Sequence, residues 1–170
     1  KFNGSWEELK HTHYLIARAN YRQAAVDLQD DVLQEKWDQM NDFLRLTGTG
    51  VTGVAEWEHQ DSASAWQSLW FEARRGVEEM ADELGLPYSK ACTLVKPSGT
   101  LGKVLNTTEG IHKPMGKYIF NNIQFAEDDP LVDKLREANY RVFKHPFQEK
   151  SVLVTFPVSY ENVEFTKEVA

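Results

Sequence analysis

Residues 62–103 read SASAWQSLWFEARRGVEEMADELGLPYSKACTLVKPSGTLGK, and this stretch decides the fold. Its first half places apolar residues at three- and four-residue steps, which predicts a long amphipathic helix. Ser62 or Ser64 can cap the start of this helix, Gly85 suits its C-terminal end, and a proline two residues later stops it. A short apolar strand, Ala91–Val95, and a tight polar turn follow. A helix followed at once by a strand is typical of α/β proteins.

The segments on either side continue the alternation of helices and strands. Upstream, Ser5 and Glu8 form the S-x-x-E pattern of a capping box, which marks the start of a helix. In chain order, the remaining elements that we expect are a helix at 6–28, a helix at 32–44, a buried glycine-rich strand at 44–54, a strand at 118–125, a helix at 131–139 and a strand at 151–158. The sequence therefore predicts an α/β fold, with residues 1–170 forming a single domain.

The composition is that of an ordinary globular chain. Of the 170 residues, 41% are hydrophobic and 26% are charged, and the longest apolar runs are too short to span a membrane. The formal net charge of −7 argues against a nucleic-acid groove, which needs clustered lysine and arginine. A phosphorylated small molecule needs only a local group of backbone N–H donors, so the charge does not exclude one.

Cysteine occurs once, as Cys92. One thiol excludes an internal disulfide and a four-cysteine zinc site, and it fits a reducing cytoplasm. We expect Cys92 to be a buried, inert residue of its strand rather than a reactive thiol. The chain begins with Lys1 rather than methionine, from which we expect a piece of a longer product.

The turn KPSGTLGK, residues 96–103, is the best candidate for a binding site. Pro97, Ser98, Gly99 and Thr100 form a tight polar bend directly after an apolar strand. Such a bend can direct consecutive N–H groups and two hydroxyls at an anion, above all where a helix begins. An ordinary turn at the end of a strand is the alternative. A Walker A loop is excluded, because two residues rather than four separate Gly99 from the next Gly-Lys pair.

Other motifs have weaker functional interpretations. GTGVTG, residues 48–53, matches the dinucleotide-binding pattern, but its glycines fall within the expected strand rather than before a helix. His11 and His13 lie two residues apart on a helix and point to different faces, which favours surface positions over a metal pair. No metal site is predicted. His112, in the run GIHKPMG, is a candidate lining residue for a site.

Three parts of the chain are informative when taken together. LVKPSGTLGKVLNTTEGIHKPMGKYIFNNIQF, residues 94–125, combines a K-P-S-G-T loop, small residues, a G-I-H motif and an aromatic-led strand. FLRLTGTGVTGVAEW, residues 43–57, precedes it, and REANYRVFKHP and SVLVTFPV follow it. In this order they resemble the late part of the catalytic barrel of class II, adenosylcobalamin-dependent ribonucleotide reductases. The similarity is to the monomeric branch that reduces ribonucleoside triphosphates, and it covers most of residues 43–158.

The resemblance implies a fold and a role for the loop. The chain would be the C-terminal half of a ten-stranded α/β barrel, with helices packed on the strands. In the family, the K-P-S-G-T loop cups the phosphate groups of the substrate, a ribonucleoside tri- or diphosphate that is reduced to the deoxyribonucleotide. Carried over by position, this role falls on Pro97, Ser98, Gly99, Thr100 and Leu101.

The radical chemistry of the family needs groups that this chain lacks. In the family, adenosylcobalamin generates a thiyl radical, and two further cysteines supply electrons with help from a glutamate and an asparagine. This chain has one cysteine and no N-x-C-x-E stretch. We therefore assign no catalytic residue, expect the isolated chain to be inactive and do not expect it to bind adenosylcobalamin tightly.

Two functions remain open at this point. Either the chain is a reductase fragment that retains phosphate recognition, or it is a non-catalytic subunit that completes a barrel supplied by another polypeptide, because a partial barrel leaves strand edges that need partners. The expected partners are accordingly the nucleotide and either the upstream half of a reductase or a second copy, with no nucleic acid and no membrane. A related reductase class with another radical source is a further alternative, which Gly99-Thr100 and His112 disfavour by resemblance.

Overall fold

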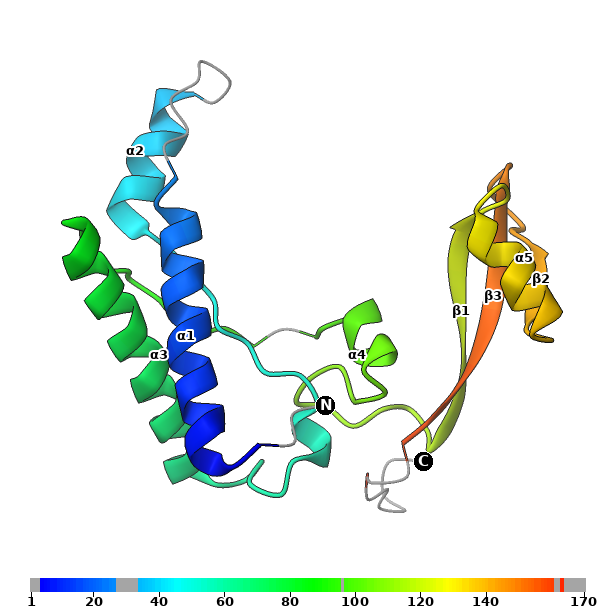
Figure 1. Ribbon diagram of the computed structural model, residues 1–170, viewed down its shortest axis with the longest axis horizontal. Helices are drawn as coiled ribbons and strands as arrows, with labels where there is room; N and C mark the ends of the chain where they lie inside the picture. The colour runs from blue at the N-terminus through cyan, green and yellow to red at the C-terminus, as the bar shows by residue number, and fades with distance from the viewer. Residues whose placement is uncertain (1–3, 27–33, 96, 161–162, 164–170) are drawn as a thin grey trace.

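The computed structural model describes residues 4–26, 34–95, 97–160 and 163 (Figure 1). Helices α1 and α3 pack side by side, while a small sheet with one helix stands apart from them (Figure 1). None of the described helices combines the length and the apolar composition that crossing a lipid bilayer requires. In chain order the elements are α1 (Trp6–Ala24), α2 (Glu35–Leu44), the 3-10 helix η1 (Val54–Glu56), α3 (Ala63–Leu84), α4 (Thr100–Val104), β1 (Tyr118–Ala126), α5 (Pro130–Glu137), β2 (Arg141–Lys144) and β3 (Ser151–Ser159).

Helix α1 begins where the sequence predicts it. The Ser5 hydroxyl accepts the Glu8 N–H at 3.3 Å, and the Glu8 carboxylate accepts the Ser5 N–H at 2.6 Å. These bonds satisfy N–H groups that the first turn of a helix leaves without partners. They also favour the charged carboxylate, which lowers the pKa of Glu8. The predicted start of the second helix, at residues 32–33, lies outside the described residues.

Helix α3 confirms the prediction of a long helix. The Ser62 side chain accepts the Ala65 N–H at 3.3 Å, and Gly85 ends the helix in the left-handed conformation, with φ 64°. The apolar stripe of α3 packs against α1 and against the segment that follows α3 in the chain. The core cluster comprises Ala17, Tyr21, Ala73, Val77, Met80, Ala81 and Cys92, so the cysteine is buried as expected.

Helices α1 and α3 approach each other closely at Gly76. A Cβ at this position would lie 2.5 Å from the Tyr14 carbonyl oxygen and 3.3 Å from the Ala17 Cβ. A side chain here would force the two helices apart, and a closely packed interior cannot absorb such a shift without cost. Gly76 therefore sets the distance between the two helices.

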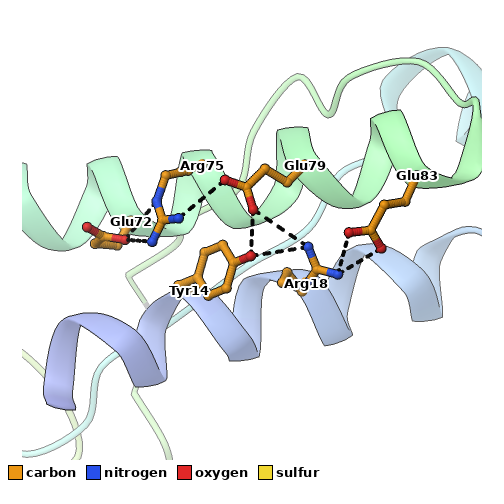
Figure 2. A network of polar contacts seen from close by, with 6 residues as sticks. All are labelled: Tyr14, Arg18, Glu72, Arg75, Glu79 and Glu83. Atoms are coloured by element: carbon orange, nitrogen blue, oxygen red, sulfur yellow. Dashed lines mark hydrogen bonds and ion pairs between the residues drawn. The ribbon is translucent and has the colours of Figure 1, made fainter.

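Charged side chains link α1 and α3 along their surface (Figure 2). The Tyr14 hydroxyl donates to Glu79 at 2.5 Å, and Arg18 donates to both carboxylate oxygens of Glu83 at 2.8 Å. The Arg75 guanidinium lies 4.2 Å from the centre of the Tyr14 ring and 3.2 Å from the Glu79 carboxylate. The hydrogen bond from Tyr14 lowers the pKa of Glu79. Ion pairs at the surface contribute little to stability. We therefore infer that this network mainly fixes the register of α1 against α3.

The predicted strands at 44–54 and 91–95 form a short parallel contact rather than a regular sheet. The N–H groups of Thr47 and Thr49 donate to carbonyl groups of the second segment at 2.9 Å each, and Thr49 forms an isolated parallel bridge with Thr93. The prediction of full strands is wrong, because the pairing is limited to one bridge and the backbone turns into η1 at Val54. Helix α3 joins the two parallel segments, which is the β-α-β arrangement of α/β proteins.

The regular sheet lies further along the chain and is antiparallel. Strand β3 is central, with β1 and β2 on either side. The predicted strands at 118–125 and 151–158 and the predicted helix at 131–139 are confirmed as β1, β3 and α5, whereas β2 was not expected. Asp129 caps α5 by accepting the Leu131 N–H at 2.9 Å. Within the part of the chain that the structure describes, the strands close no barrel, and the fold is α/β in the broad sense.

His13 is buried on α1, with 6% of its surface exposed, although the sequence favoured a surface position. It shares the helix face of Ala17 and Tyr21, which are also buried. Burial disfavours the charged imidazolium and lowers the pKa of His13, and the hydrogen bond to the Leu9 carbonyl at 3.1 Å opposes this only in part. Because a carbonyl can only accept, Nδ1 carries the proton and Nε2 is an acceptor.

We expect the free energy of unfolding to fall as the pH drops below 6.5, the ordinary pKa of histidine. The unfolded chain protonates at His13 more readily than the folded chain, so the stability present above this pH is lost as the pH falls through the folded pKa. Urea unfolding from about pH 8 to about pH 5 should show a weaker pH dependence in His13→Gln than in the wild type. The exposed His11→Gln is the matched control for the loss of a histidine from the same helix. Identical profiles for His13→Gln and the wild type would contradict a buried neutral imidazole.

Candidate functional site

The loop Pro97–Leu101 runs from the end of the second extended segment into the first turn of α4. Pro97 is exposed, and 57% of the Leu101 surface is exposed. Gly99 has φ 58° and ψ −126°, a backbone conformation that residues with a side chain rarely adopt. A Cβ at Gly99 would meet nothing within 4 Å, so backbone geometry rather than lack of space requires glycine. The bend is therefore open at this residue.

Two of the N–H groups in the bend donate to carbonyl groups of the described residues. The Ser98 N–H donates to the Glu109 carbonyl at 2.8 Å, and the Leu101 N–H lies 3.3 Å from the Ser98 carbonyl oxygen. For the N–H groups of Gly99 and Thr100, no partner is found among the described residues. The donors left for an anion are thus two consecutive amides at the start of α4. The predicted role of the Thr100 hydroxyl concerns a side chain outside the described part of the chain.

Thr52 ties the loop to the rest of the fold. Its Oγ1 lies 2.5 Å from Ser98 Oγ and 3.1 Å from the carbonyl oxygens of both Thr108 and Glu109. A carbonyl oxygen can only accept, and the Thr52 hydroxyl has one proton to donate. When Thr52 donates this proton to a carbonyl, the Ser98 hydroxyl donates to Thr52. The predicted role of the Ser98 hydroxyl is to face an anion, whereas in the structure this hydroxyl lies against Thr52. The loop and the segment at 107–109 are thereby joined through both the backbone and the side chain of Ser98.

Two glycines allow the chain to pack closely around this loop. A Cβ at Gly53, which has φ 75°, would lie 2.2 Å from Thr107 Oγ1. A Cβ at Gly102 would lie 2.7 Å from Ser98 Oγ and 3.2 Å from the Thr107 carbonyl oxygen. Glu56 completes the contact by accepting the Thr108 N–H at 2.6 Å. The supporting residues before α3 were not predicted, and the glycines of GTGVTG were the available signal for a close approach.

The charged residues that follow the loop do not form an open cationic site. Lys103 is paired with the Glu109 carboxylate, and the two side chains are 20% and 27% exposed. This pair holds the segment at 107–109 against α4, so the positive charge is already partly neutralised. His112 is exposed, and among the described residues it has no hydrogen bond, ion pair or ring contact. Its role as a lining residue therefore stays a prediction.

Comparison with a solved structure identifies the fold. A B12-dependent, class II ribonucleotide reductase matches 92% of this chain with a TM-score of 0.75 and 21% sequence identity. The chain corresponds to 26% of that protein. No protein-family model matches the sequence.

Curated relatives agree with the structural match. The adenosylcobalamin-dependent ribonucleoside-triphosphate reductase of Levilactobacillus brevis is 30% identical over 110 residues, which are 65% of this chain and 15% of the relative. The enzyme of the same name from Lacticaseibacillus paracasei is 33% identical over 129 residues, 70% of this chain and 17% of the relative. A probable enzyme of this kind from Dictyostelium discoideum is 28% identical over 130 residues, 72% of this chain and 17% of the relative.

The chain is homologous to a segment of the class II, adenosylcobalamin-dependent ribonucleotide reductases, which confirms the resemblance seen in the sequence. Within this class, its curated relatives are ribonucleoside-triphosphate reductases. The chain spans 15% to 17% of the length of these relatives.

We expect Thr52→Val to lower the free energy of unfolding by about 1 kcal/mol, the net worth of a typical hydrogen bond. Valine keeps the shape of the side chain and removes the hydroxyl that joins Ser98 to the carbonyls of residues 108 and 109. Urea unfolding is the measurement. Thr12→Val is the control, because the Thr12 hydroxyl bonds within α1, to the Glu8 carbonyl, and its loss should change stability by less than about 0.5 kcal/mol. Equal effects of the two substitutions would contradict an anchoring role for Thr52.

Proposed function

We propose that this chain is part of a ribonucleotide reductase, which converts ribonucleotides to deoxyribonucleotides, and that Pro97–Leu101 binds the phosphate groups of the substrate. The homology to ribonucleoside-triphosphate reductases supports the first part. One observation carries the second part: the adjacent N–H groups of Gly99 and Thr100 have no partner among the described residues and lie at an open bend. In this proposal, residues 1–170 are one structural unit of a ten-stranded α/β barrel whose other strands are supplied elsewhere.

The bend suits a phosphate group for electrostatic reasons. Successive N–H groups in a turn can point to the same side and form a concavity that binds anions. The first amides of a helix also carry a partial positive charge, so the start of α4 adds to this attraction. Because the donors are backbone groups, a chain with a net charge of −7 can still bind a phosphate group at this one place.

We assign the sulfur chemistry to another part of the enzyme. Cys92 is the single cysteine of the sequence, and 3% of its surface is exposed. Burial raises the pKa of its thiol, which makes the residue chemically inert. The chemistry that the family resemblance implies needs three thiols. We therefore propose that the reactive cysteines and the adenosylcobalamin named for the relatives are held outside these 170 residues.

Addition of a ribonucleoside triphosphate to the ¹⁵N-labelled chain should shift the amide signals of Gly99 and Thr100 more than that of Ser98. The substitution Gly99→Ala should weaken this binding about tenfold, because a side chain disfavours the observed backbone conformation by about 1–3 kcal/mol and the bend then leaves the geometry that binds the phosphate groups. Inorganic triphosphate should displace the nucleotide, since the phosphate groups carry the recognition. Titration followed by amide chemical shifts measures both effects.

The control for Gly99→Ala is Gly85→Ala. Gly85 has φ 64°, and a Cβ at Gly85 would meet nothing within 4 Å, as at Gly99. Unlike Gly99, Gly85 lies at the end of α3. Gly85→Ala should lower stability and leave the nucleotide affinity unchanged. If the Gly99 and Thr100 amides do not respond to the nucleotide, the phosphate-binding role is wrong, while the homology stands.

A second candidate function is that the chain completes a barrel supplied by another polypeptide. The parallel contact between the segments at 44–54 and 91–95 favours this function, because it contains an isolated bridge and leaves apolar side chains outside. Leu46 and Val95 have 56% and 74% of their surfaces exposed. Unpaired strand edges beside exposed apolar residues favour pairing with a further chain.

Sedimentation velocity of the chain mixed with the upstream part of the Levilactobacillus brevis relative should then show a one-to-one complex. Val95→Lys should abolish the complex, because it places a charge beside the strand edge. Phe147→Lys is the matched control, since Phe147 has 91% of its surface exposed and lies in the turn before β3. A chain that remains monomeric in every mixture would reject the second function.

A further inference from the structure

A cleft of about 440 Å³ lies between the helices α1 and α3 and the two extended segments. Trp66, Leu69 and Trp70 of α3 line it on the helical side, and Leu94 and Val95 line it on the side of the extended segments. None of its lining residues is aspartate, glutamate, lysine or arginine. No residue of the loop at 97–101 lines it, so it is separate from the proposed phosphate site.

Two of the residues that line the cleft each have a buried polar side-chain atom with no hydrogen-bond partner within the described residues. These atoms are Nε2 of His13 and Oγ1 of Thr49. His13 is 6% exposed and Thr49 is 3% exposed. Most buried polar side-chain atoms in folded proteins have a partner, so two such atoms in one cleft indicate groups that a bound molecule would satisfy.

The hydrogen-bonding roles of the two atoms follow from their surroundings. His13 Nδ1 lies 3.1 Å from the Leu9 carbonyl oxygen and therefore donates to it, which makes Nε2 an acceptor. The Thr49 hydroxyl carries one proton that has no acceptor among the described residues. The cleft therefore offers one acceptor and one donor between apolar walls that include two indole rings.

We propose that this cleft binds an uncharged aromatic molecule that carries one hydrogen-bond donor and one acceptor, such as a carboxamide on a fused ring. The donor bonds to His13 Nε2, and the acceptor receives the Thr49 hydroxyl, once a small rotation of the two side chains turns these buried atoms toward the ligand. The volume lies within the range of about 300–1,000 Å³ that is usual for small-molecule sites, which combine apolar walls with a few polar groups. A charged ligand is disfavoured, because no lining residue carries a compensating charge.

The fluorescence of the tryptophans in the cleft can test this proposal with three probes that share one ring system. 2-Naphthamide has a donor and an acceptor, methyl 2-naphthoate has an acceptor only, and 2-naphthoate is an anion. We expect saturable binding of the amide, binding of the ester that is about tenfold weaker through the loss of one hydrogen bond, and no saturable binding of the anion. Isothermal titration with the full chain confirms the stoichiometry of one molecule.

Two substitutions separate the two hydrogen bonds. Thr49→Val keeps the shape of the side chain and removes the donor, so it should weaken the amide and the ester by the same factor. His13→Phe removes the acceptor, so it should reduce the affinity for the amide to that for the ester and leave the ester unchanged. The unchanged ester also shows that the cleft is intact in the variant, and the exposed His11→Phe should alter neither probe.

The proposal is overturned if none of the probes binds in a saturable way. Equal affinities for the amide and the ester would also overturn it, because the cleft would then be a purely apolar surface. Binding of the anion as tight as that of the amide would show that the two polar atoms do not select the ligand.

Discussion

The positions of the functional groups in this chain depend on the close contact between α1 and α3. The absence of a side chain at Gly76 lets the backbone of α1 approach at Tyr14, where a Cβ would lie 2.5 Å from the carbonyl oxygen. The same packing brings the Tyr21 hydroxyl to the Pro87 carbonyl at 2.6 Å, which fixes the chain directly after α3. That chain continues into the segment at 91–95, so helix packing determines where the loop begins.

The loop is held firmly on one side and left open on the other. The Ser98 N–H donates to the Glu109 carbonyl, and the Ser98 hydroxyl bonds to Thr52. Both groups are therefore already engaged and do not bind the ligand. The next two amides, of Gly99 and Thr100, are left without partners among the described residues. Because the residues that fix the geometry differ from the residues that can bind, the donors are pre-organised before an anion arrives, which lowers the cost of binding.

The parts of the fold that could be predicted are those with local causes. The capping box of Ser5 and Glu8, and the capping of α3 by Ser62 and Gly85, involve residues close in sequence, and all are present. The loop at 97–101 was also recognised locally, but its support by Thr52 was missed, because the whole of α3 separates the two in the sequence. The glycine-rich run at 44–54 was predicted as a full strand. Whether an extended segment forms a ladder depends on neighbours that its own residues do not specify.

Unsatisfied polar groups have different consequences at the open bend and in the cleft. At the open bend, water can bind the amides of Gly99 and Thr100, so an empty loop costs the fold little. In the cleft, Nε2 of His13 and Oγ1 of Thr49 are buried, and leaving such atoms unpaired costs about 1–3 kcal/mol each. A group that is buried without a partner weakens the folded state until something binds to it. Occupancy of the cleft is therefore coupled to the stability of the α1–α3 packing. Occupancy of the loop relieves no comparable cost in the fold.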